Sequence, residues 1–361
     1  MRVIHPGAFD QPDEMNNSAT PRDLELMARA LECALQSPEV GRNPRVGCVL
    51  ATDSGEIVAE GFHRGAGLPH AEVEALQAAT AQGIDTAGLT AVVTLEPCNH
   101  EGLTRPCSQA LIEAGITRVI YAASDPGVES SGGHQSLLDA GIDVVGGVLA
   151  KRSESMNAHW FFSIRHQRPF VTAKWAQSLD GRIAAEDLTS QWITGPRARQ
   201  RVHEQRASHG VIMVGTTTAL VDNPSLTARL ESGELADTQP HAVVLGMRPI
   251  PEGAHLRNHP GGFRQIATHD PAVALNELFA EGFRSVYLEG GKTLISAFVA
   301  ADLIDEYHLT MGGMLLGGSQ TAIDDIGVGS MSEAKPLDIV SAEVLDNDVW
   351  VVARPKRAKE E

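Results

Sequence analysis

The stretch TLEPCNHEGLTRPC at residues 94–107 decides the fold of the N-terminal half, because it places a cysteine at the boundary of each of two regular elements. Cys98 follows the apolar run 91–95, which is typical of a buried strand, and Cys107 precedes a segment with helical spacing. A second stretch, PHAE at residues 69–72, lies at the entrance of another expected helix. Strands that alternate with helices along a chain are typical of an α/β fold.

The residue types in these two stretches predict a zinc site. His70, Cys98 and Cys107 offer one imidazole and two thiolates, which leave the fourth position of a tetrahedral zinc ion open to water. Zinc lowers the pKa of that water toward neutrality and so makes a hydroxide nucleophile. Glu72 is not needed as a ligand and is therefore the candidate general acid and base, as in zinc deaminases. Eight residues (NHEGLTRP) lie between the two cysteines, whereas the general deaminase signature, Cys-x-x-Cys, has two.

Helix geometry restricts where His70 can lie. On a regular helix, residues two apart point about 200° away from each other, so His70 and Glu72 could not share one pocket. We therefore predict that His70 sits at an irregular helix entrance, which Pro69 favours. Cys33 and Cys48 have no partner at metal-ligand spacing, and we expect both to be structural, with Cys48 also a candidate for lining the pocket.

Composition and charge exclude several classes of protein. The chain has 29 basic and 46 acidic residues, a net charge of −17, whereas nucleic-acid-binding proteins carry a basic surface. The sequence shows no polybasic membrane patch, no secretory signal, no apolar run near the roughly 18 residues of a membrane span, and too few cysteines for a disulfide scaffold. We expect a cytoplasmic homo-oligomer with a small-molecule substrate and neither a nucleic-acid nor a membrane partner.

The length of 361 residues favours two domains at roughly 100–200 residues each. Periodic strand and helix patterns run through both halves, and they are interrupted by a mixed, basic and non-periodic stretch that we take as the domain boundary. The expected organisation is a flexible N-terminal arm at 1–19, a zinc domain at 20–150, a linker at 151–168, a second α/β domain at 169–355 and a charged tail at 356–361.

The second half contains a concentration of arginines, whose guanidinium groups match phosphate oxygens. For Arg197, Arg199 and Arg201 we prefer a solvated helix face. Gly290 and Gly291 lie between an expected strand and helix, where backbone amides can bind a phosphate. A Gly-x-Gly-x-x-Gly motif is absent from the sequence, so a standard Rossmann domain is not supported.

Seven stretches together resemble the bifunctional deaminase/reductase family of riboflavin biosynthesis, over about residues 20–355. They are NPRVGCV (43–49), PHAEVEAL (69–76), TLEPCNHEGLTRPC (94–107), KWAQSLDGRIA (174–184), SQWITGPRAR (190–199), VGTTTALVDNPSLTAR (214–229) and LEGGKTLISAF (288–298). The resemblance implies an N-terminal cytidine-deaminase-like α/β/α domain followed by a dihydrofolate-reductase-like α/β domain that uses NADPH. The eight-residue interval between the cysteines is characteristic of this family.

The resemblance also implies two consecutive reactions. The first is hydrolytic deamination of 2,5-diamino-6-ribosylamino-4(3H)-pyrimidinone 5′-phosphate, and the second reduces the ribosyl group to ribityl, giving 5-amino-6-ribitylamino-uracil 5′-phosphate. His70, Cys98 and Cys107 match the zinc ligands, and Glu72 matches the proton shuttle. Asn43 and His63 match deaminase substrate positions.

In the second domain the resemblance assigns two groups of residues. The cofactor positions are Ala176, Trp192, Thr218, Asp222, Gly291, Lys292, Thr293, Leu294, Ile295, Ser296 and Ala297. The substrate positions are Lys174, Asp180, Ser190, Arg206, Leu226, Arg229 and Glu289. Among these, we expect Arg206 and Arg229 to bind the substrate's 5′-phosphate. The chain departs from the family pattern at Thr104-Arg105-Pro106-Cys107, at residues 125–128, at Gly246-Met247 and at Gly313.

Two other functions stay open at this point. A nucleic-acid or nucleoside zinc deaminase with an accessory nucleotide-binding domain would need a basic surface and stacking aromatics, against which the charge of −17 and 4% aromatic content argue. A zinc-stabilised ligand-binding or regulatory protein would have no use for Glu72, which is suited to acid/base chemistry and is not required as a ligand.

Overall fold

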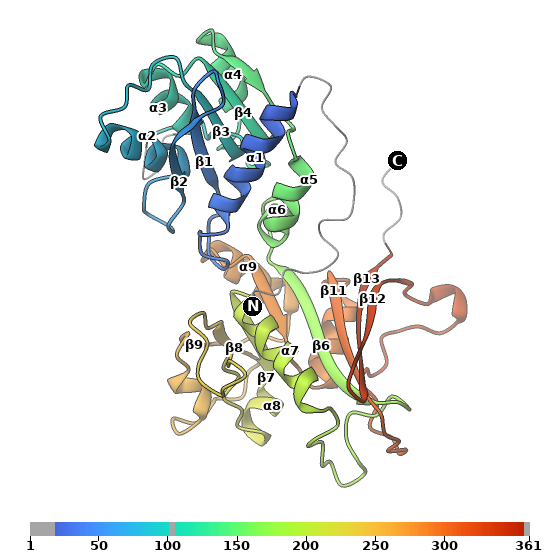
Figure 1. The fold of residues 1–361 in the computed structure, drawn as a ribbon. Coiled ribbons are helices and arrows are strands. Elements are labelled where there is room, and N and C mark those ends of the chain that lie inside the picture. The colour runs from blue at the N-terminus through green and yellow to red at the C-terminus, as the bar shows by residue number, and fades with distance from the viewer. Residues whose placement is uncertain (1–18, 101–104, 357–361) are drawn as a thin grey trace. The chain divides into compact units, whose positions relative to one another are not determined.

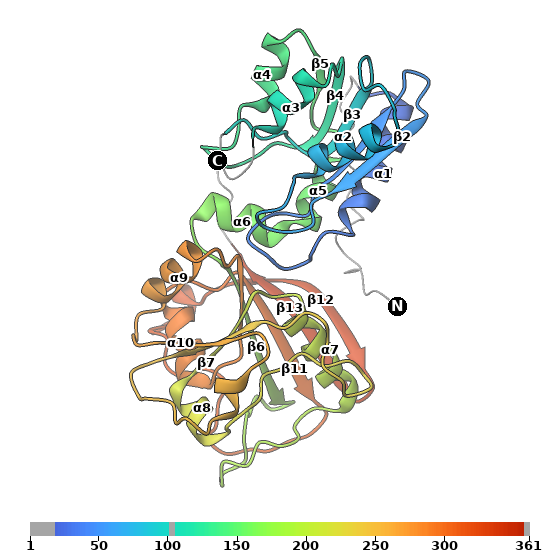
Figure 2. The ribbon, with the colours of Figure 1, turned by 90° about the vertical axis from the view of Figure 1, so that its left-hand side faces the viewer.

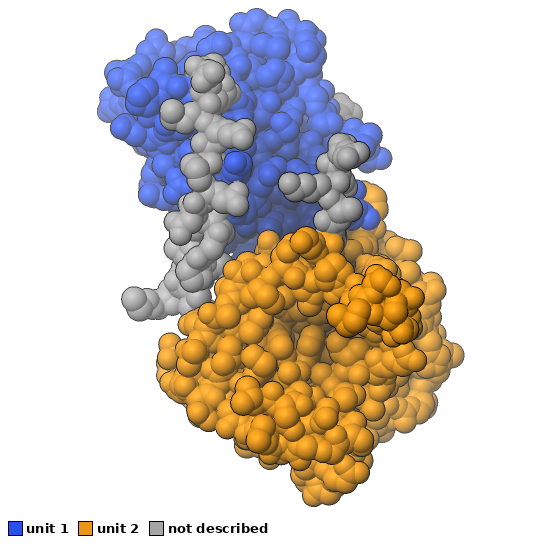
Figure 3. Space-filling view, turned by 90° about the vertical axis from the view of Figure 1, so that its right-hand side faces the viewer, with its two compact units in different colours: residues 1–166 blue, residues 167–361 orange. Residues whose placement is uncertain are grey.

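A computed structural model of the chain describes residues 19–100 and 105–356. The chain separates between His166 and Gln167 into two compact units, which Figure 3 colours separately. Of the arm expected at 1–19 and the tail expected at 356–361, only Ala19 and Lys356 fall within the described residues.

The first unit is a three-layer structure with a five-stranded sheet between helices (Figures 1 and 2). The strand order is β2-β1-β3-β4-β5, in which β1 pairs antiparallel with β2 and β3, and β3, β4 and β5 run parallel. The strands are β1 (Gly47–Ala51), β2 (Ile57–Phe62), β3 (Thr90–Leu95), β4 (Arg118–Ala123) and β5 (Asp143–Val145).

Apolar side chains cover both faces of this sheet because successive residues of a strand point to opposite sides. On β1, Val49 packs with the first helix, whereas Cys48 and Leu50 pack with the second. The helices are α1 (Pro21–Ala34), α2 (Ala71–Ala81), α3 (Cys107–Glu113), α4 (Gly133–Asp139), α5 (Ala150–Met156) and α6 (Ala158–His166). Thr20 caps α1 through reciprocal hydrogen bonds with Asp23.

The stretch at 151–168 differs from the expected linker, because most of it forms α5 and α6 within the first unit. The Ser153 hydroxyl donates a 2.5 Å hydrogen bond to the carbonyl of Thr94, and the Asn157 amide bonds both backbone groups of Arg45. Phe161 is 3% exposed in the core of this unit. The mixed composition of residues 151–168 is therefore that of two short helices, each of which buries only part of its surface.

The second unit is built on an eight-stranded sheet of order β12-β13-β11-β6-β10-β7-β8-β9. The strands from β11 to β9 run parallel, and β13 and β12 add an antiparallel pair at one edge. The strands are β6 (Phe170–Ser178), β7 (Val211–Gly215), β8 (His241–Leu245), β9 (Phe263–Ile266), β10 (Ser285–Leu288), β11 (Glu306–Gly312), β12 (Leu337–Leu345) and β13 (Asp348–Pro355).

Helices lie on both faces of this second sheet. Tyr287 of β10 packs with α7 (Pro196–Ala207), whereas its neighbours Val286 and Leu288 pack with α10 (Lys292–Ala300), so α7 and α10 cover opposite faces. The remaining elements are α8 (Thr216–Val221), α9 (Pro271–Ala280) and the 3₁₀ turns η1 (His255–Asn258) and η2 (Met331–Glu333). Among the described residues, no helix combines the length and the apolar character needed to cross a bilayer.

Candidate active sites

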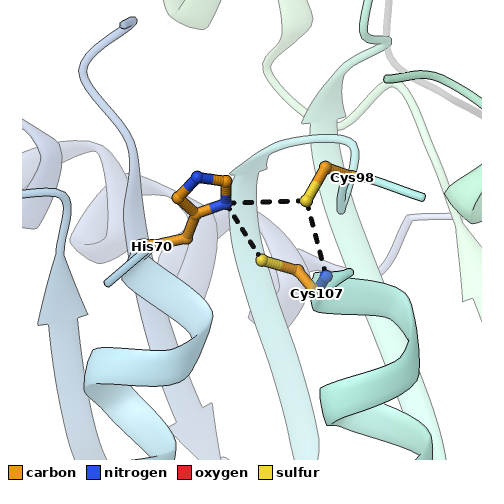
Figure 4. A group of neighbouring side chains, drawn as sticks. All are labelled: His70, Cys98 and Cys107. Atoms are coloured by element: carbon orange, nitrogen blue, oxygen red, sulfur yellow. Dashed lines mark hydrogen bonds between the residues drawn. The ribbon is translucent and has the colours of Figure 1, made fainter. Parts of the chain in front are cut away.

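Three candidate zinc ligands meet where β3 and two helices begin or end. His70 is the N-cap of α2 and has extended backbone angles of φ −73° and ψ 164°, so its side chain leaves the helical register, as the sequence predicts. Cys98 follows β3, and Cys107 is the first residue of α3. Figure 4 shows the three side chains pointing toward one another.

The distances in this cluster fit a metal ion. His70 Nδ1 lies 3.2 Å from Cys107 Sγ and 3.5 Å from Cys98 Sγ, and the three ligand atoms lie within 4.8 Å of one another. Ligands on a tetrahedral zinc ion, at about 2.0–2.3 Å from the metal, are themselves roughly 3.5 Å apart. One imidazole nitrogen with two sulfurs is a donor set that zinc prefers. Residues 101–104 of the motif lie outside the described part of the chain.

The surroundings favour the thiolate form at Cys98. Its hydrogen bonds with Cys107 and His70 lower the pKa of the Cys98 thiol to about 4. The backbone N–H of Cys107 also donates to Cys98 Sγ over 3.4 Å. A thiolate is the form that coordinates a metal, so Cys98 is prepared for that role.

Glu72 lies on the first turn of α2 and is only 4% exposed. Burial raises the pKa of its carboxyl group to about 7; the nearby His70 opposes this rise, and Cys98 adds to it. A carboxyl group that titrates near neutrality can both accept and donate a proton during a reaction.

Asn43 and His63 lie beside the zinc ligands. His63 Nδ1 donates to the carbonyl of Pro69 over 3.0 Å, so Nε2 accepts from the Asn43 amide over 2.9 Å. The rings of His63 and His70 are 5.4 Å apart, edge to face. Because burial lowers the pKa of His63, the neutral ring with this tautomer is favoured.

The second unit contains a cavity of 480 Å³, a volume typical of small-molecule sites. Its wall comes from β6, from residues 190–194, from α7 and α8, and from the turn between β10 and α10. Eleven of the residues that the sequence assigns to cofactor or substrate line this cavity. They are Ala176, Trp192, Thr218, Asp222, Gly291, Lys292 and Ile295 from the cofactor group, and Lys174, Ser190, Arg206 and Glu289 from the substrate group.

The other seven assigned residues are not among those that line the described cavity: Thr293, Leu294, Ser296, Ala297, Asp180, Leu226 and Arg229. Ser296 instead donates to the carbonyl of Lys292 and accepts from the backbone of Asp324, which fixes the start of α10. Asp180 accepts from the backbone of Leu316 and Gly317 and so anchors that loop. Arg229 is exposed and donates to the carbonyl of Gly233.

A cluster of charged side chains lies at the inner wall of the cavity. Arg206 and Glu289 form two hydrogen bonds, of 2.6 and 2.9 Å, and Arg206 Nη1 donates to the carbonyl of Thr227. Burial raises the pKa of Glu289, but the charge and hydrogen bonds of Arg206 outweigh this and leave the pKa below its usual value. Burial lowers the pKa of Lys174, and the charge of Glu289 opposes that change.

We expected three arginines of α7 to lie on a solvated helix face. This expectation is correct only for Arg197, which is exposed. Arg199 lines the cavity, and its guanidinium stacks on Trp192 at 4.4 Å from the ring centroid. Arg201 lies 5.9 Å from the ring of Trp350. The cavity-lining residues of α7 are Arg199, Val202, His203 and Arg206, spaced as one helix face, and this spacing is the signal that would have found Arg199.

Gly246 accounts for one departure from the family pattern. It has φ +131°, and a Cβ atom there would lie 2.9 Å from Cγ2 of Thr216. Glycine thus allows Thr216 to approach, and the Thr216 hydroxyl accepts hydrogen bonds from Arg248.

Comparisons with known proteins agree with this division of the chain. Residues 20–123 match the cytidine and deoxycytidylate deaminase zinc-binding region, and residues 169–351 match the RibD C-terminal domain. The riboflavin biosynthesis protein RibD of Corynebacterium ammoniagenes is 47% identical over 277 residues, which cover 76% of this chain and 81% of that protein. The RibD protein of Mycobacterium tuberculosis is 43% identical over 327 residues, which cover 90% of this chain and 95% of that protein.

Two solved structures are similar over nearly the whole chain. Acinetobacter baumannii RibD has a TM-score of 0.82 at 33% identity and covers 93% of this chain and 99% of that one. The Thermotoga maritima diaminohydroxyphosphoribosylaminopyrimidine deaminase/5-amino-6-(5-phosphoribosylamino)uracil reductase has a TM-score of 0.79 at 32% identity, covering 92% of this chain and 99% of that one.

Proposed function

The chain belongs to the RibD family of riboflavin-biosynthesis proteins, and from this premise we propose which residues perform each of its two reactions. It is a deaminase and a reductase, with zinc and NADPH as cofactors. We propose that the deaminase acts on 2,5-diamino-6-ribosylamino-4(3H)-pyrimidinone 5′-phosphate and that the reductase acts on the deaminated product. The observation that carries the first assignment is the convergence of one imidazole and two sulfurs beside a buried carboxyl group.

In the deaminase unit, His70, Cys98 and Cys107 would hold the zinc ion, which supplies an activated water. Glu72 would accept the proton of the water whose oxygen attacks the ring carbon bearing the 2-amino group. The same carboxyl group then protonates the departing amine, which leaves as ammonia. The pKa of Glu72, raised to about 7, allows both transfers near neutral pH.

Asn43 and His63 are proposed to orient the pyrimidine. Their mutual hydrogen bond and the bond from His63 to the carbonyl of Pro69 fix both side chains beside His70. A polar group that is held in place before the substrate arrives needs little reorganisation when it binds.

In the reductase unit, NADPH held in this cavity would supply the hydride that C1′ of the ribosyl group needs when its bond to the ring oxygen breaks. The ring oxygen needs a proton to become the ribityl hydroxyl. We assign that proton to Lys174, which lines the cavity and whose pKa burial lowers, so that its ammonium group releases a proton readily. Glu289 and Arg206 hold the neighbouring charges in place.

The start of α10 is the proposed phosphate site of the cofactor. Gly291 is the N-cap of this helix, and Lys292 follows it at the cavity wall. Helix N-termini bind phosphates through their free backbone amides and the helix dipole. Ala176, Trp192, Thr218 and Asp222 complete the part of the wall assigned to the cofactor.

We propose that the enzyme forms a homo-oligomer through the edge of the second sheet. Strand β12 is an edge strand, and its apolar residues Ile339, Val340 and Val344 are 64%, 51% and 69% exposed. Exposed apolar edge strands pair readily with another chain. Light scattering of the wild type and of Ile339→Lys tests this, since a monomeric variant with both activities intact is expected. All four cysteines are free, which is consistent with the proposed cytoplasmic location.

One assay tests both proposed reactions. The purified protein is incubated with the diaminopyrimidine phosphate, and ammonia is measured with and without NADPH. Ammonia release should not need NADPH, whereas NADPH oxidation should follow the release of ammonia. NADPH oxidation without ammonia release would contradict the proposed order of the two reactions.

A further inference from the structure

We propose that Asp324 weakens the binding of NADPH to the reductase cavity, because its carboxylate competes with the pyrophosphate of the cofactor for the ammonium group of Lys292. The inference rests on the cofactor-phosphate site proposed above at the start of α10. It adds a residue that determines cofactor affinity and that belongs neither to the described cavity wall nor to the residues assigned from the sequence.

The start of α10 concentrates positive charge. Its N-cap, Gly291, has no side chain to accept a hydrogen bond from the backbone amides of the first turn. These amides and the helix dipole make a helix N-terminus partly positive, and a cation at that end is unfavourable. The first residue of α10 is nevertheless Lys292, whose side chain lines the cavity. An anion beside Lys292 therefore offsets an otherwise unfavourable arrangement of charge.

Asp324 supplies this anion within the chain itself. Its Oδ1 lies 3.0 Å from Nζ of Lys292, and its Oδ2 accepts a long hydrogen bond of 3.5 Å from the hydroxyl of Thr293. The carboxylate thus engages the side chains of the first two residues of the helix. The side chains of Lys292 and Asp324 are 36% and 38% exposed, and an ion pair with this exposure contributes little stability. A ligand with more negative charge can therefore displace the carboxylate.

The backbone of Asp324 is fixed to the same helix. The Ser296 hydroxyl donates to the carbonyl of Lys292 over 2.7 Å and accepts from the backbone N–H of Asp324 over 2.9 Å. The preceding residue, Ile323, packs against the core on the α10 side of the sheet, and Ala322 lines the cavity. The carboxylate is therefore held beside Lys292 by an anchored backbone, and Ser296 acts at the cofactor site through this anchor.

Cofactor binding requires the ammonium group of Lys292 to exchange partners. The pyrophosphate of NADPH carries two negative charges and the Asp324 carboxylate carries one, so both anions cannot stay close to Lys292 without repulsion. Breaking the pair with Asp324 opposes binding, and the cavity therefore binds NADPH less tightly than it would with a neutral residue at this position. Weaker binding also lets the oxidised cofactor dissociate faster, because differences in affinity between related complexes lie mostly in the dissociation rate.

The test measures the Kd of NADPH and of NADH by fluorescence titration. The variant is Asp324→Asn, which removes the charge and keeps the size of the side chain. Asp325→Asn is the matched control, because Asp325 is the next residue, is exposed, and accepts a hydrogen bond from the backbone of Gly327. Lys292→Gln is measured alone and together with Asp324→Asn. Circular dichroism checks that every variant is folded.

We expect Asp324→Asn to lower the Kd of NADPH and of NADH alike, by about 3–5-fold, as fits the small free energy of an exposed ion pair. The two cofactors share the pyrophosphate, so the factor should be the same for both. In about 1 M salt the difference from the wild type should shrink, because salt screens exposed charges. Asp325→Asn should change either Kd by less than about 1.5-fold, a change too small for a lost ion pair.

The double variant tests whether the effect acts through Lys292. Lys292→Gln should raise both Kd values, and adding Asp324→Asn to it should change them little, because the ion pair no longer exists. A merely structural role of Asp324 would instead give the same change in both backgrounds and at high salt, which would contradict the competition.

Three further results would overturn the inference. An unchanged or raised Kd in Asp324→Asn would mean that Asp324 does not compete, or that it orients Lys292 for the cofactor. A lower Kd for NADPH alone would assign the competition to the 2′-phosphate, and an equal effect of Asp325→Asn would reduce it to net charge. A wild-type protein that binds neither cofactor would contradict the proposed reductase function, whereas binding without an effect of Asp324 contradicts this inference alone.

Discussion

Arg206 and Glu289 form a bidentate ion pair in which the two side chains are only 14% and 11% exposed. They come from α7 and from the end of β10, so the pair joins a covering helix to the sheet. Two buried charges of this kind stabilise a fold only while both are present. The pair therefore belongs to the structural frame of the cavity as well as to its chemistry.

Removing one partner should destabilise the reductase unit. Glu289→Ala leaves the Arg206 charge buried and unpaired, and we expect a loss of about 3–5 kcal/mol in the free energy of unfolding. Urea denaturation followed by circular dichroism measures it. The control is Glu343→Ala, which removes a half-exposed partner of Arg201 and should cost no more than about 1 kcal/mol. Equal losses in both variants would show that burial of the pair has no effect.

The first prediction for the zinc site concerns the metal content of the purified protein. The purified protein should hold about one zinc ion per chain, since three ligands converge on one point. The double variant Cys98→Ser and Cys107→Ser should lose the metal, as measured by elemental analysis. Cys33→Ala is the control, because Cys33 is buried away from the ligand cluster, and it should keep the zinc. Full zinc retention in the double variant would rule out this ligand set.

Glu72→Gln should keep zinc but lose deamination. The amide cannot carry the proton, and general acid/base residues contribute at least about 10²-fold to the rate. Ammonia release measures the loss, and metal analysis of the same sample shows whether the site is intact. Glu74→Gln is the matched control, since Glu74 lies on the same helix in an ion pair with Arg64. A rate close to that of the wild type would disprove the role of Glu72.

The two activities should be separable by mutation. Glu72→Gln, supplied with the deaminated intermediate, should oxidise NADPH at the wild-type rate, because Glu72 and the reductase cavity belong to different compact units. Spectrophotometry at the NADPH absorbance band measures this. If a folded Glu72→Gln protein lost its reductase activity, one composite site would have to replace the two proposed here.

Lowering the pH should reduce the free energy of unfolding of the second unit, because Glu306 becomes protonated. Burial raises the pKa of Glu306, but the hydrogen bond from His308 and the charge of Arg354 outweigh it and hold the pKa at about 2, against 4.5 for an exposed group. A lowered folded-state pKa contributes stability above pH 4.5 that is lost as the pH falls toward 2. The contribution is on the order of 3 kcal/mol, since each pKa unit corresponds to about 1.4 kcal/mol.

This contribution is measured by urea denaturation of the wild type and of Glu306→Gln at several pH values between 5 and 2. The range runs from above the ordinary pKa of 4.5 down to the folded-state pKa of about 2, so Glu306 becomes protonated across it. The variant should lose less stability over this range, since it has no carboxylate to protonate. Parallel curves for the two proteins would show that Glu306 makes no such contribution.

The zinc site could be predicted from sequence because each ligand lies at a local boundary, where a strand ends or a helix begins. The irregular position of His70 followed from the incompatibility of a two-residue spacing with a regular helix. The reductase cavity could be predicted only in part. Its wall joins β6 to β10, which lie far apart in sequence but pair directly in the sheet, so neither segment by itself shows what it faces.

Strands β11 and β12 show two opposite reasons why a sequence pattern can fail to indicate a strand. Strand β12 is exposed over nearly its whole length, so it lacks the alternation that marks a half-buried strand, and pairing with β13 determines its place. Strand β11 buries Glu306, His308 and Thr310, so polar residues occupy positions where the pattern of a strand calls for apolar ones. In both cases the tertiary context, and not the local sequence, determines the structure.

The junction between His166 and Gln167 places two catalysts on one polypeptide. Every round of translation therefore delivers them in equal numbers, and changes in gene expression cannot alter their ratio. The steady-state level of the intermediate is then determined by the turnover and affinity of each unit. Proteolytic removal of a chain with a damaged reductase unit also withdraws an intact deaminase, so selection acts on the stability of both units together.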